Sequence, residues 1–194
     1  ADPSSGGYAL AEQIQALGHK KLGIIHYMPS IDAEGSDNYF VYEVYSRPGK
    51  LLQIFEKYGL DCEERFHCFE CRNFSSILKT LKRKMKEGNL PTVYWCVNDE
   101  TAHWTIDALS ELGLKVPGDI SVIGYDGVSI TSEENLTTIS LPFYGIGCKA
   151  LNLLLDYYEN GKTEQNSYVE IATSLVIKKT LAYAKKNNYG KDGK

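Results

Sequence analysis

PTVYWCVNDETAHWTIDALSELGLKVPGDISVIGYDG, residues 91–127, is the stretch that decides the fold of this chain. An apolar run rich in aromatic residues, 92–97, predicts a buried strand. Apolar residues at three- and four-residue steps then predict a helix over 100–112, and a second buried strand is predicted over 120–125. Strand, helix and strand within this length form a βαβ unit. Its crossover is expected to be right-handed, so the two strands should run parallel.

Two polar residues directly follow these predicted strands. Asn98 and Asp126 stand at the carboxyl ends, which meet at one edge of a parallel sheet, where open α/β sheets bind their ligands. An amide and a carboxylate together suit the adjacent hydroxyl groups of a small polar ligand. The same residues also have common structural roles, because Asn before a helix caps it and Asp-Gly forms turns. Spacing alone leaves both interpretations open.

The order of segments resembles the effector-binding domain of lactose-repressor-type (LacI/GalR) transcriptional regulators. The resemblance is carried by LGHKKLGI at 17–24, NDE at 98–100, DISV at 119–122, GYD at 124–126, LTTI at 136–139 and PF at 142–143. It covers residues 1 to about 180 as a matched order of motifs. It implies an α/β fold with an open, mostly parallel sheet and helices on both faces.

The resemblance also implies a domain organisation and a function. Residues 1–180 would be the C-terminal portion of an effector-binding and dimerisation domain, with 142–160 crossing toward a second lobe and 181–194 a flexible tail. A small polar effector, most simply a sugar, would bind between the lobes and alter DNA affinity. Operator DNA would be bound only through a headpiece that precedes residue 1, and the protein would be a homodimer.

Further site residues follow from the same resemblance. In the family, an arginine near the start of a helix contacts the effector, and Arg47 is the candidate here, although its spacing to the next glycine is one residue shorter. Phe143 matches an aromatic residue that lines the cleft, whereas Leu141 replaces a polar residue, so we expect a less polar roof. The predicted effector-binding residues are therefore Asn98, Asp126, Phe143 and Arg47.

Hydrophobic periodicity predicts the remaining elements, and one helix carries two unusual residues. His103 and Trp104 are bulkier or more polar than the resemblance leads us to expect on a helix that faces a partner subunit. They are assigned to a dimer face that is either rearranged or not shared by this protein. Further helices are predicted over 8–17, 51–58, 75–87 and 142–158, and strands over 22–28, 65–69 and 168–177.

Composition argues against several kinds of site. The 194 residues carry a net charge of −4, which argues against nucleic-acid binding by this segment, because phosphate contacts need clustered Lys and Arg. The basic run at 79–86 is expected to be a solvated helix face. The sequence opens with no signal peptide and has no apolar run of membrane length. An odd count of five cysteines fits a cytoplasmic protein better than a disulfide framework.

Cys68 and Cys71 form a lone C-x-x-C motif. A zinc site would need two more ligands at paired spacing, and a redox motif would open a helix. We therefore predict incidental buried thiols, with no metal site and no cofactor.

Two other functions remain to be weighed. A sugar-binding transport receptor shares the fold, and a signal sequence upstream of residue 1 would favour it. An enzyme would need a catalytic pair near Asn98 and Asp126, but Asp99 and Glu100 are better explained as first-turn acids that favour the helix dipole. We predict no catalytic residues.

Overall fold

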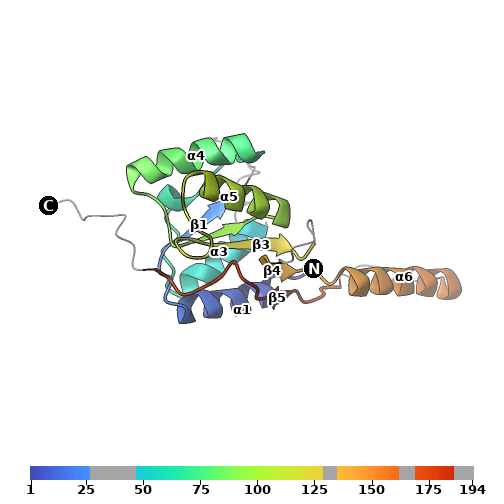
Figure 1. The fold of residues 1–194 in the computed structure, drawn as a ribbon. Coiled ribbons are helices and arrows are strands. Elements are labelled where there is room, and N and C mark those ends of the chain that lie inside the picture. Colours follow the sequence, from blue (N-terminus) through green and yellow to red (C-terminus); the bar gives the residue numbers. More distant parts are fainter. Residues whose placement is uncertain (27–46, 129–134, 162–168, 186–194) are drawn as a thin grey trace, which may run out of the picture.

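Five strands form one sheet in the order β1-β2-β3-β4-β5 in the computed structural model, which describes residues 1–26, 47–128, 135–161 and 169–185 (Figure 1). The first four strands are parallel and the fifth is antiparallel to β4. Their bounds are β1 Leu22–Ile25, β2 Val93–Cys96, β3 Ser121–Asp126, β4 Thr137–Ser140 and β5 Ser174–Val176. The predicted fold class, an open and mostly parallel sheet, is confirmed.

Helices cover both faces of this sheet (Figure 1). Helices α1 (Pro3–Ala16) and α3 (Arg47–Lys57) pack on one face, in a core that includes Val93 and Trp95 of β2. Helices α4 (Phe74–Glu87) and α5 (Asp99–Glu111) pack on the other face, in a core that includes Tyr94 and Cys96. Successive residues of β2 therefore point to opposite faces and are buried on both, as expected of a parallel strand between two helix layers.

The βαβ unit predicted from residues 91–127 is present. Strand β2, helix α5 and strand β3 follow one another, and β2 pairs in parallel with β3 from Val93 opposite Ser121 to Trp95 opposite Ile123. Both strands therefore end at the same edge of the sheet, which is the geometry that the sequence predicted for Asn98 and Asp126.

The strand predicted over 65–69 is wrong. The segment contains the short 3-10 helix η1 (Glu64–Phe66), and its ladder pairing with β1 is limited to one isolated bridge between Cys68 and Ile25. Nδ1 of the buried His67 accepts the backbone N–H of Ile24 at 3.1 Å, so an imidazole ring takes a donor that a regular ladder would use. Burial lowers the pKa of His67 to about 4, which keeps the ring neutral and able to accept.

The last helix, α6 (Phe143–Asn160), extends away from the sheet and its covering helices (Figure 1). No residue of α6 whose side chain is described is buried, and Tyr144 is 88% exposed. The strand predicted over 168–177 is shorter than expected: β5 covers only Ser174–Val176 within the described part of that range. No helix in the described ranges is both long and apolar enough to cross a membrane.

Candidate functional site

The carboxyl ends of β2 and β3 lie side by side, and Arg47 joins them. Its Nη1 donates to the carbonyl oxygen of Val97, directly after β2, at 3.0 Å and lies 3.4 Å from Oδ1 of Asp126 at the end of β3. The guanidinium carbon is 3.9 Å from the centre of the Tyr125 ring. Asn98 follows Val97 in the chain. The structure thus brings Arg47, Asn98 and Asp126 to one edge of the sheet, and we call these three residues the rim site.

Arg47 reaches this edge because helix α3 begins with it. Pro48 stands in the first turn, where its missing N–H has no partner to lose. The side chains of Arg47 and Asp126 are 38% and 26% exposed, so their ion pair contributes at most about 1 kcal/mol to stability. Such a weak pair leaves the guanidinium able to turn toward a ligand.

Asp126 has an unusual backbone conformation, with φ at 109°. Residues other than glycine rarely adopt this region, and such strain is concentrated at functional sites. The next residue, Gly127, also has positive φ, and a Cβ there would overlap Ser140 of β4. Burial raises the pKa of the Asp126 carboxyl; the nearby Arg47 cation opposes that rise and the Asp99 carboxylate adds to it.

Asn98 serves as the N-cap of α5. Its Oδ1 accepts the backbone N–H of Thr101 at 2.8 Å, so the structural role that the sequence left open is observed for the oxygen. Among the described residues, its amide nitrogen donates to no protein group. Asn98 can therefore offer a ligand a donor, whereas its acceptor is already used by the helix.

Asp99 has a role that the sequence did not predict. It lies in the first turn of α5, as expected, but it is also only 2% exposed and ties three elements together. Its carboxylate accepts from Oγ1 of Thr138 in β4 at 2.6 Å and from the backbone N–H of Val128 at 2.7 Å. Burial raises its pKa, and these hydrogen bonds oppose the rise. Asp99 thus fixes the loop that directly follows Asp126.

Phe143 stands where the chain leaves the sheet. The N–H of Leu141 donates to the carbonyl oxygen of Asp126 at 3.0 Å, so the exit from β4 lies beside the rim site. Phe143, two residues further on, begins α6 and is 55% exposed. Its ring is open to solvent, and a contact between that ring and an effector stays a prediction.

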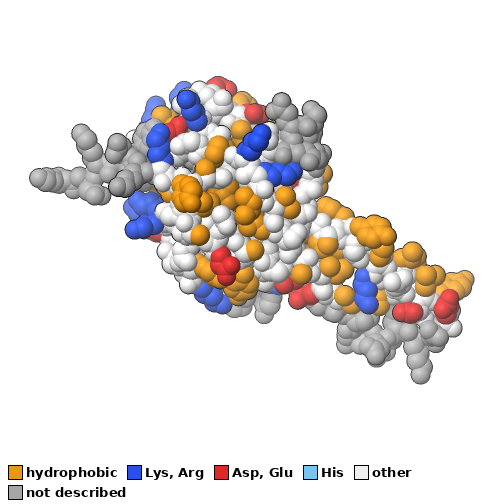
Figure 2. Space-filling view, turned by 60° about the horizontal axis from the view of Figure 1, so that its bottom comes forward, with side chains coloured by type: hydrophobic (Ala, Val, Ile, Leu, Met, Phe, Trp, Pro, Cys, Tyr) orange, Lys and Arg blue, Asp and Glu red, His pale blue; other side chains and the backbone are white. Residues whose placement is uncertain are grey.

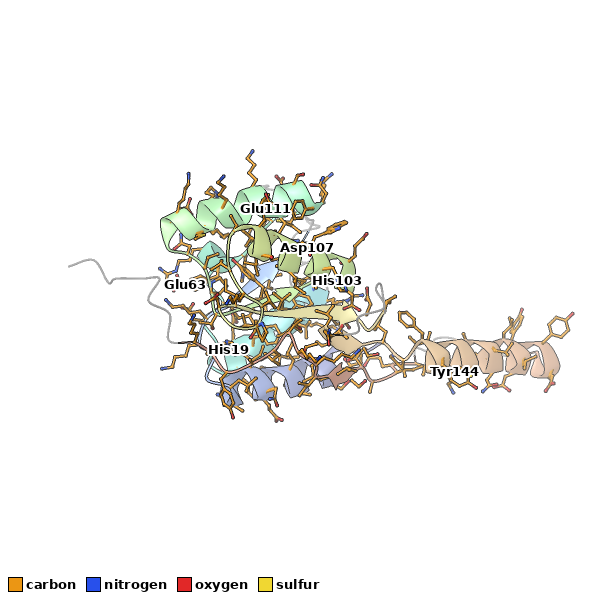
Figure 3. The ribbon with its side chains drawn as sticks, in the orientation of Figure 1. His19, Glu63, His103, Asp107, Glu111 and Tyr144 are labelled. Carbon is orange, nitrogen blue, oxygen red and sulfur yellow. The ribbon has the colours of Figure 1, made fainter. Side chains whose placement is uncertain are left out.

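The two residues assigned to a dimer face lie on α5. Trp104 is half-buried and packs against the core on the α4 and α5 face of the sheet. His103 is also half-buried, and Figure 3 shows it on the same helix as Asp107 and Glu111. The Trp104 indole therefore contributes to packing within this chain, and a contact with a partner subunit stays a prediction.

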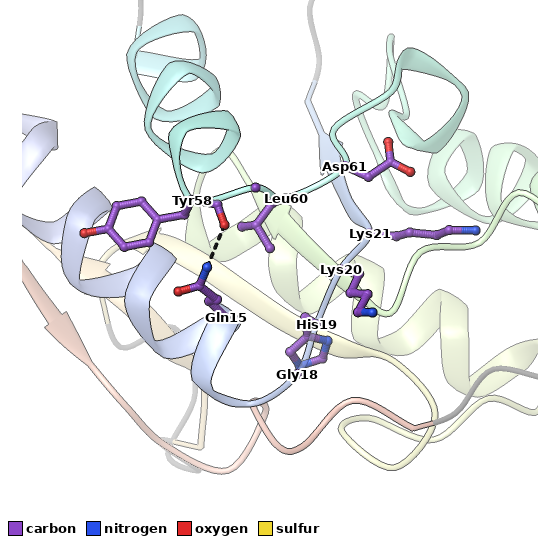
Figure 4. A pocket seen from close by; sticks show the side chains of 9 residues that line it. Gln15, Gly18, His19, Lys20, Lys21, Tyr58, Leu60 and Asp61 are labelled. Carbon is purple, nitrogen blue, oxygen red and sulfur yellow. Dashed lines mark hydrogen bonds between the residues drawn. The ribbon is translucent and has the colours of Figure 1, made fainter.

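A hollow lies at the opposite edge of the sheet, before β1 (Figure 4). Its volume is about 580 Å³, and His19, Lys20 and Asp61 are among the residues that line it. The His19 ring contacts Oγ1 of Thr92 and the carbonyl oxygen of Ala182, both at 2.9 Å. Burial lowers the pKa of His19, which fits a neutral structural histidine. Within the described ranges, no group of three or more His, Cys, Asp or Glu could hold a metal ion.

Comparisons with known proteins agree with this architecture. Residues 11–181 match the family of periplasmic binding protein-like domains. The chain is 32% identical over 181 residues to the HTH-type transcriptional repressor PurR of Haemophilus influenzae, a match that covers 91% of this chain and 51% of the relative. The chain therefore spans about half the length of the curated relatives it matches.

Solved structures of low sequence identity share the fold. A dimeric Lac repressor with an 11-residue C-terminal deletion superposes with a TM-score of 0.74 at 24% identity, covering 95% of this chain and 63% of that one. A LacI family transcriptional regulator from Arthrobacter sp. FB24, in complex with lactose, superposes with a TM-score of 0.73 at 18% identity, covering 92% of this chain and 64% of that one.

Proposed function

The chain belongs to the family of periplasmic binding protein-like domains, in the form found in LacI/GalR-type regulators, and we propose on this premise that it senses a small polar effector for a transcriptional regulator. The observation that carries the proposal is the rim site. A cation, an amide donor and a carboxylate borne on a strained backbone lie where two parallel strands end. The curated relatives are repressors, so neither an enzyme nor a transport receptor is favoured.

The rim site would bind hydroxyl-bearing ligands through complementary hydrogen bonds. The Asp126 carboxylate would accept from a ligand hydroxyl, while Arg47 and the amide nitrogen of Asn98 would donate. Phe143 would pack on the apolar face of the ligand. Because the Arg47–Asp126 pair is partly exposed and weak, a ligand that bridges the two groups would replace an existing contact at little cost.

The remaining parts of the proposal concern the whole regulator. Residues 1–180 would be the C-terminal portion of the effector-binding domain, and 142–160 would cross to a second lobe that closes over the ligand. The open surface of α6 supports this crossing. Operator DNA would be bound by a separate headpiece, and the regulator would work as a homodimer with His103 and Trp104 near the shared face. The lactose complex of a structural neighbour supports a sugar as effector.

Isothermal titration of the full-length protein tests this proposal. Lactose, D-ribose and the planar heterocycle hypoxanthine, which has no ring hydroxyls, form the panel. We expect a sugar to bind, and Asp126→Ala to weaken that binding about tenfold or more, because a charged hydrogen bond contributes roughly 1.5–3 kcal/mol. Glu111→Gln, an exposed carboxylate at the far end of α5, is the control. Equal affinity of Asp126→Ala and wild type would refute the rim site, and binding of hypoxanthine alone would refute the sugar.

A further inference from the structure

Arg47 contacts an aromatic ring in addition to the two oxygen atoms at the rim site. Its guanidinium carbon lies 3.9 Å from the centre of the Tyr125 ring, so the cation stands over the face of that ring. The face of an aromatic ring attracts cations, and a planar, weakly hydrated guanidinium suits it especially well. A ligand that takes over the pairing with Asp126 leaves this second contact in place.

The Tyr125 ring is held rigidly beside the rim site. It is only 1% exposed and belongs to the core that α1 and α3 cover. Its strand, β3, is paired with β2 on one side and β4 on the other. The ring also meets that of the fully buried Trp95 at 82°, with the ring centres 6.1 Å apart. Such an edge-to-face contact favours one orientation of the Tyr125 ring.

Arg47, by contrast, is weakly held by its other partners. It is the first residue of α3, its side chain is 38% exposed, and its ion pair with Asp126 spans 3.4 Å. An exposed arginine side chain samples many rotamers, and restricting it before a ligand arrives removes part of the entropy cost of binding. A rigid ring under the guanidinium provides this restriction in the free protein.

The ring face, and not a charged phenol, supplies the attraction. Burial raises the pKa of the Tyr125 hydroxyl above 10.0, and the nearby Arg47 cation opposes that rise. The hydroxyl is therefore uncharged at neutral pH. A phenylalanine at this position would keep the contact with Arg47, whereas a ring with less negative charge on its face would weaken it.

We propose that Tyr125 is a positioning residue for effector binding, whose ring holds the Arg47 guanidinium in the orientation that donates to the ligand. This inference deepens the proposed function and rests on it. Tyr125 acts through Arg47 and not by touching the effector. Its contribution to affinity therefore depends on the electron density of the ring, and it disappears when Arg47 is absent.

Isothermal titration of the full-length protein with lactose and D-ribose tests this with two rings of similar size. Tyr125→Phe keeps the ring face, and a phenylalanine with three ring fluorines at the same position draws negative charge away from it. We expect Tyr125→Phe to bind like wild type and the fluorinated ring to bind about two- to fivefold more weakly, as the loss of a cation–π contact predicts. In an Arg47→Met background the two rings should bind equally.

A matched control uses the same two replacements at Tyr94. This tyrosine is also fully buried, but it lies in the core on the opposite face of the sheet. Fluorination there should leave sugar affinity unchanged. Equal affinity of the two rings at position 125, or the same loss in the Arg47→Met background, would overturn the proposal, because ring packing alone would then explain the result.

Urea denaturation of the same proteins decides the contact without a ligand. The loss in the unfolding equilibrium constant on fluorination should be about two- to fivefold larger with Arg47 present than in the Arg47→Met background. Equal losses in both backgrounds would overturn the contact itself. If neither sugar binds while the two backgrounds differ, the proposed function and the effector role of Tyr125 fail together, and the Arg47–Tyr125 contact stands.

Discussion

Helices α4 and α6 both carry apolar side chains at helical spacing but are buried to very different extents. Ile77 and Leu81 of α4 are fully buried in the core on the α4 and α5 face of the sheet. In α6, by contrast, Leu151, Leu154 and Tyr158 are 55%, 61% and 87% exposed, and Figure 2 shows hydrophobic side chains spread along the helix that projects from the body. The difference teaches that helical periodicity predicts that a face will be covered, but does not say which surface covers it.

A matched pair of leucine truncations gives the largest expected effect. Leu81→Ala should cost about 3 kcal/mol of unfolding free energy because it leaves a cavity in a closed core, and Leu154→Ala should change it by less than about 0.5 kcal/mol. Urea denaturation of this chain, followed by tryptophan fluorescence, measures both. A cost for Leu154→Ala close to that for Leu81→Ala would mean that α6 is covered in solution, and would remove the contrast between the two helices.

Asp99→Ala should have the next largest effect on stability. It tests the buried carboxylate that connects the packed core to the rim site. The substitution strips Thr138 and Val128 of their shared acceptor, so we expect a loss of about 2 kcal/mol in stability and weaker effector binding as the loop after Asp126 loosens. Asp107→Ala, an exposed acid on the same helix, is the control and should be nearly neutral. Calorimetric melting measures stability, and unchanged melting of Asp99→Ala would contradict the structural role.

Asp126→Asn should have the smallest effect, and its sign depends on pH. Burial raises the pKa of Asp126 in the folded state above 3.8, so the folded protein favours the protonated acid and loses stability as pH rises through that raised pKa. The neutral Asn avoids this loss. We expect equal stability of variant and wild type below pH 3.8 and a gain of less than about 1 kcal/mol for the variant at pH 7. Thermal melts across this pH range measure both proteins. A variant less stable than wild type at pH 7 would contradict a raised pKa of Asp126 in the folded state.

Local patterns predicted the central part of the fold. The apolar run before Asn98, the helix cap and the second apolar run are contained within residues 91–127, and β2, α5 and β3 appear where expected. The strand over 65–69 failed because alternation of residue types cannot reveal that the His67 ring takes the N–H of Ile24. The helix predicted over 51–58 begins earlier, at Arg47, because Pro48 is tolerated in the first turn of a helix.

The candidate site was only partly predictable for a similar reason. Asn98 and Asp126 follow strands, so their shared edge could be read from topology. The role of Asp99 depends on Val128 and Thr138, which lie 29 and 39 residues further along the chain, and no local pattern encodes those contacts. The contacts of Arg47 with Val97 and Asp126 span 50 and 79 residues, which is longer still. The resemblance suggested Arg47 as a site residue, but its partners could be identified only from the three-dimensional structure.

The most direct test of the rim site is amide hydrogen exchange of the full-length protein with and without lactose, or with whichever panel member binds. The rim site predicts slower exchange at 97–101 and 126–128, where β2 and β3 end, with no change at 58–61 beside the hollow at the opposite edge. Protection confined to 58–61, with exchange at 97–101 and 126–128 unaltered by bound ligand, would contradict it.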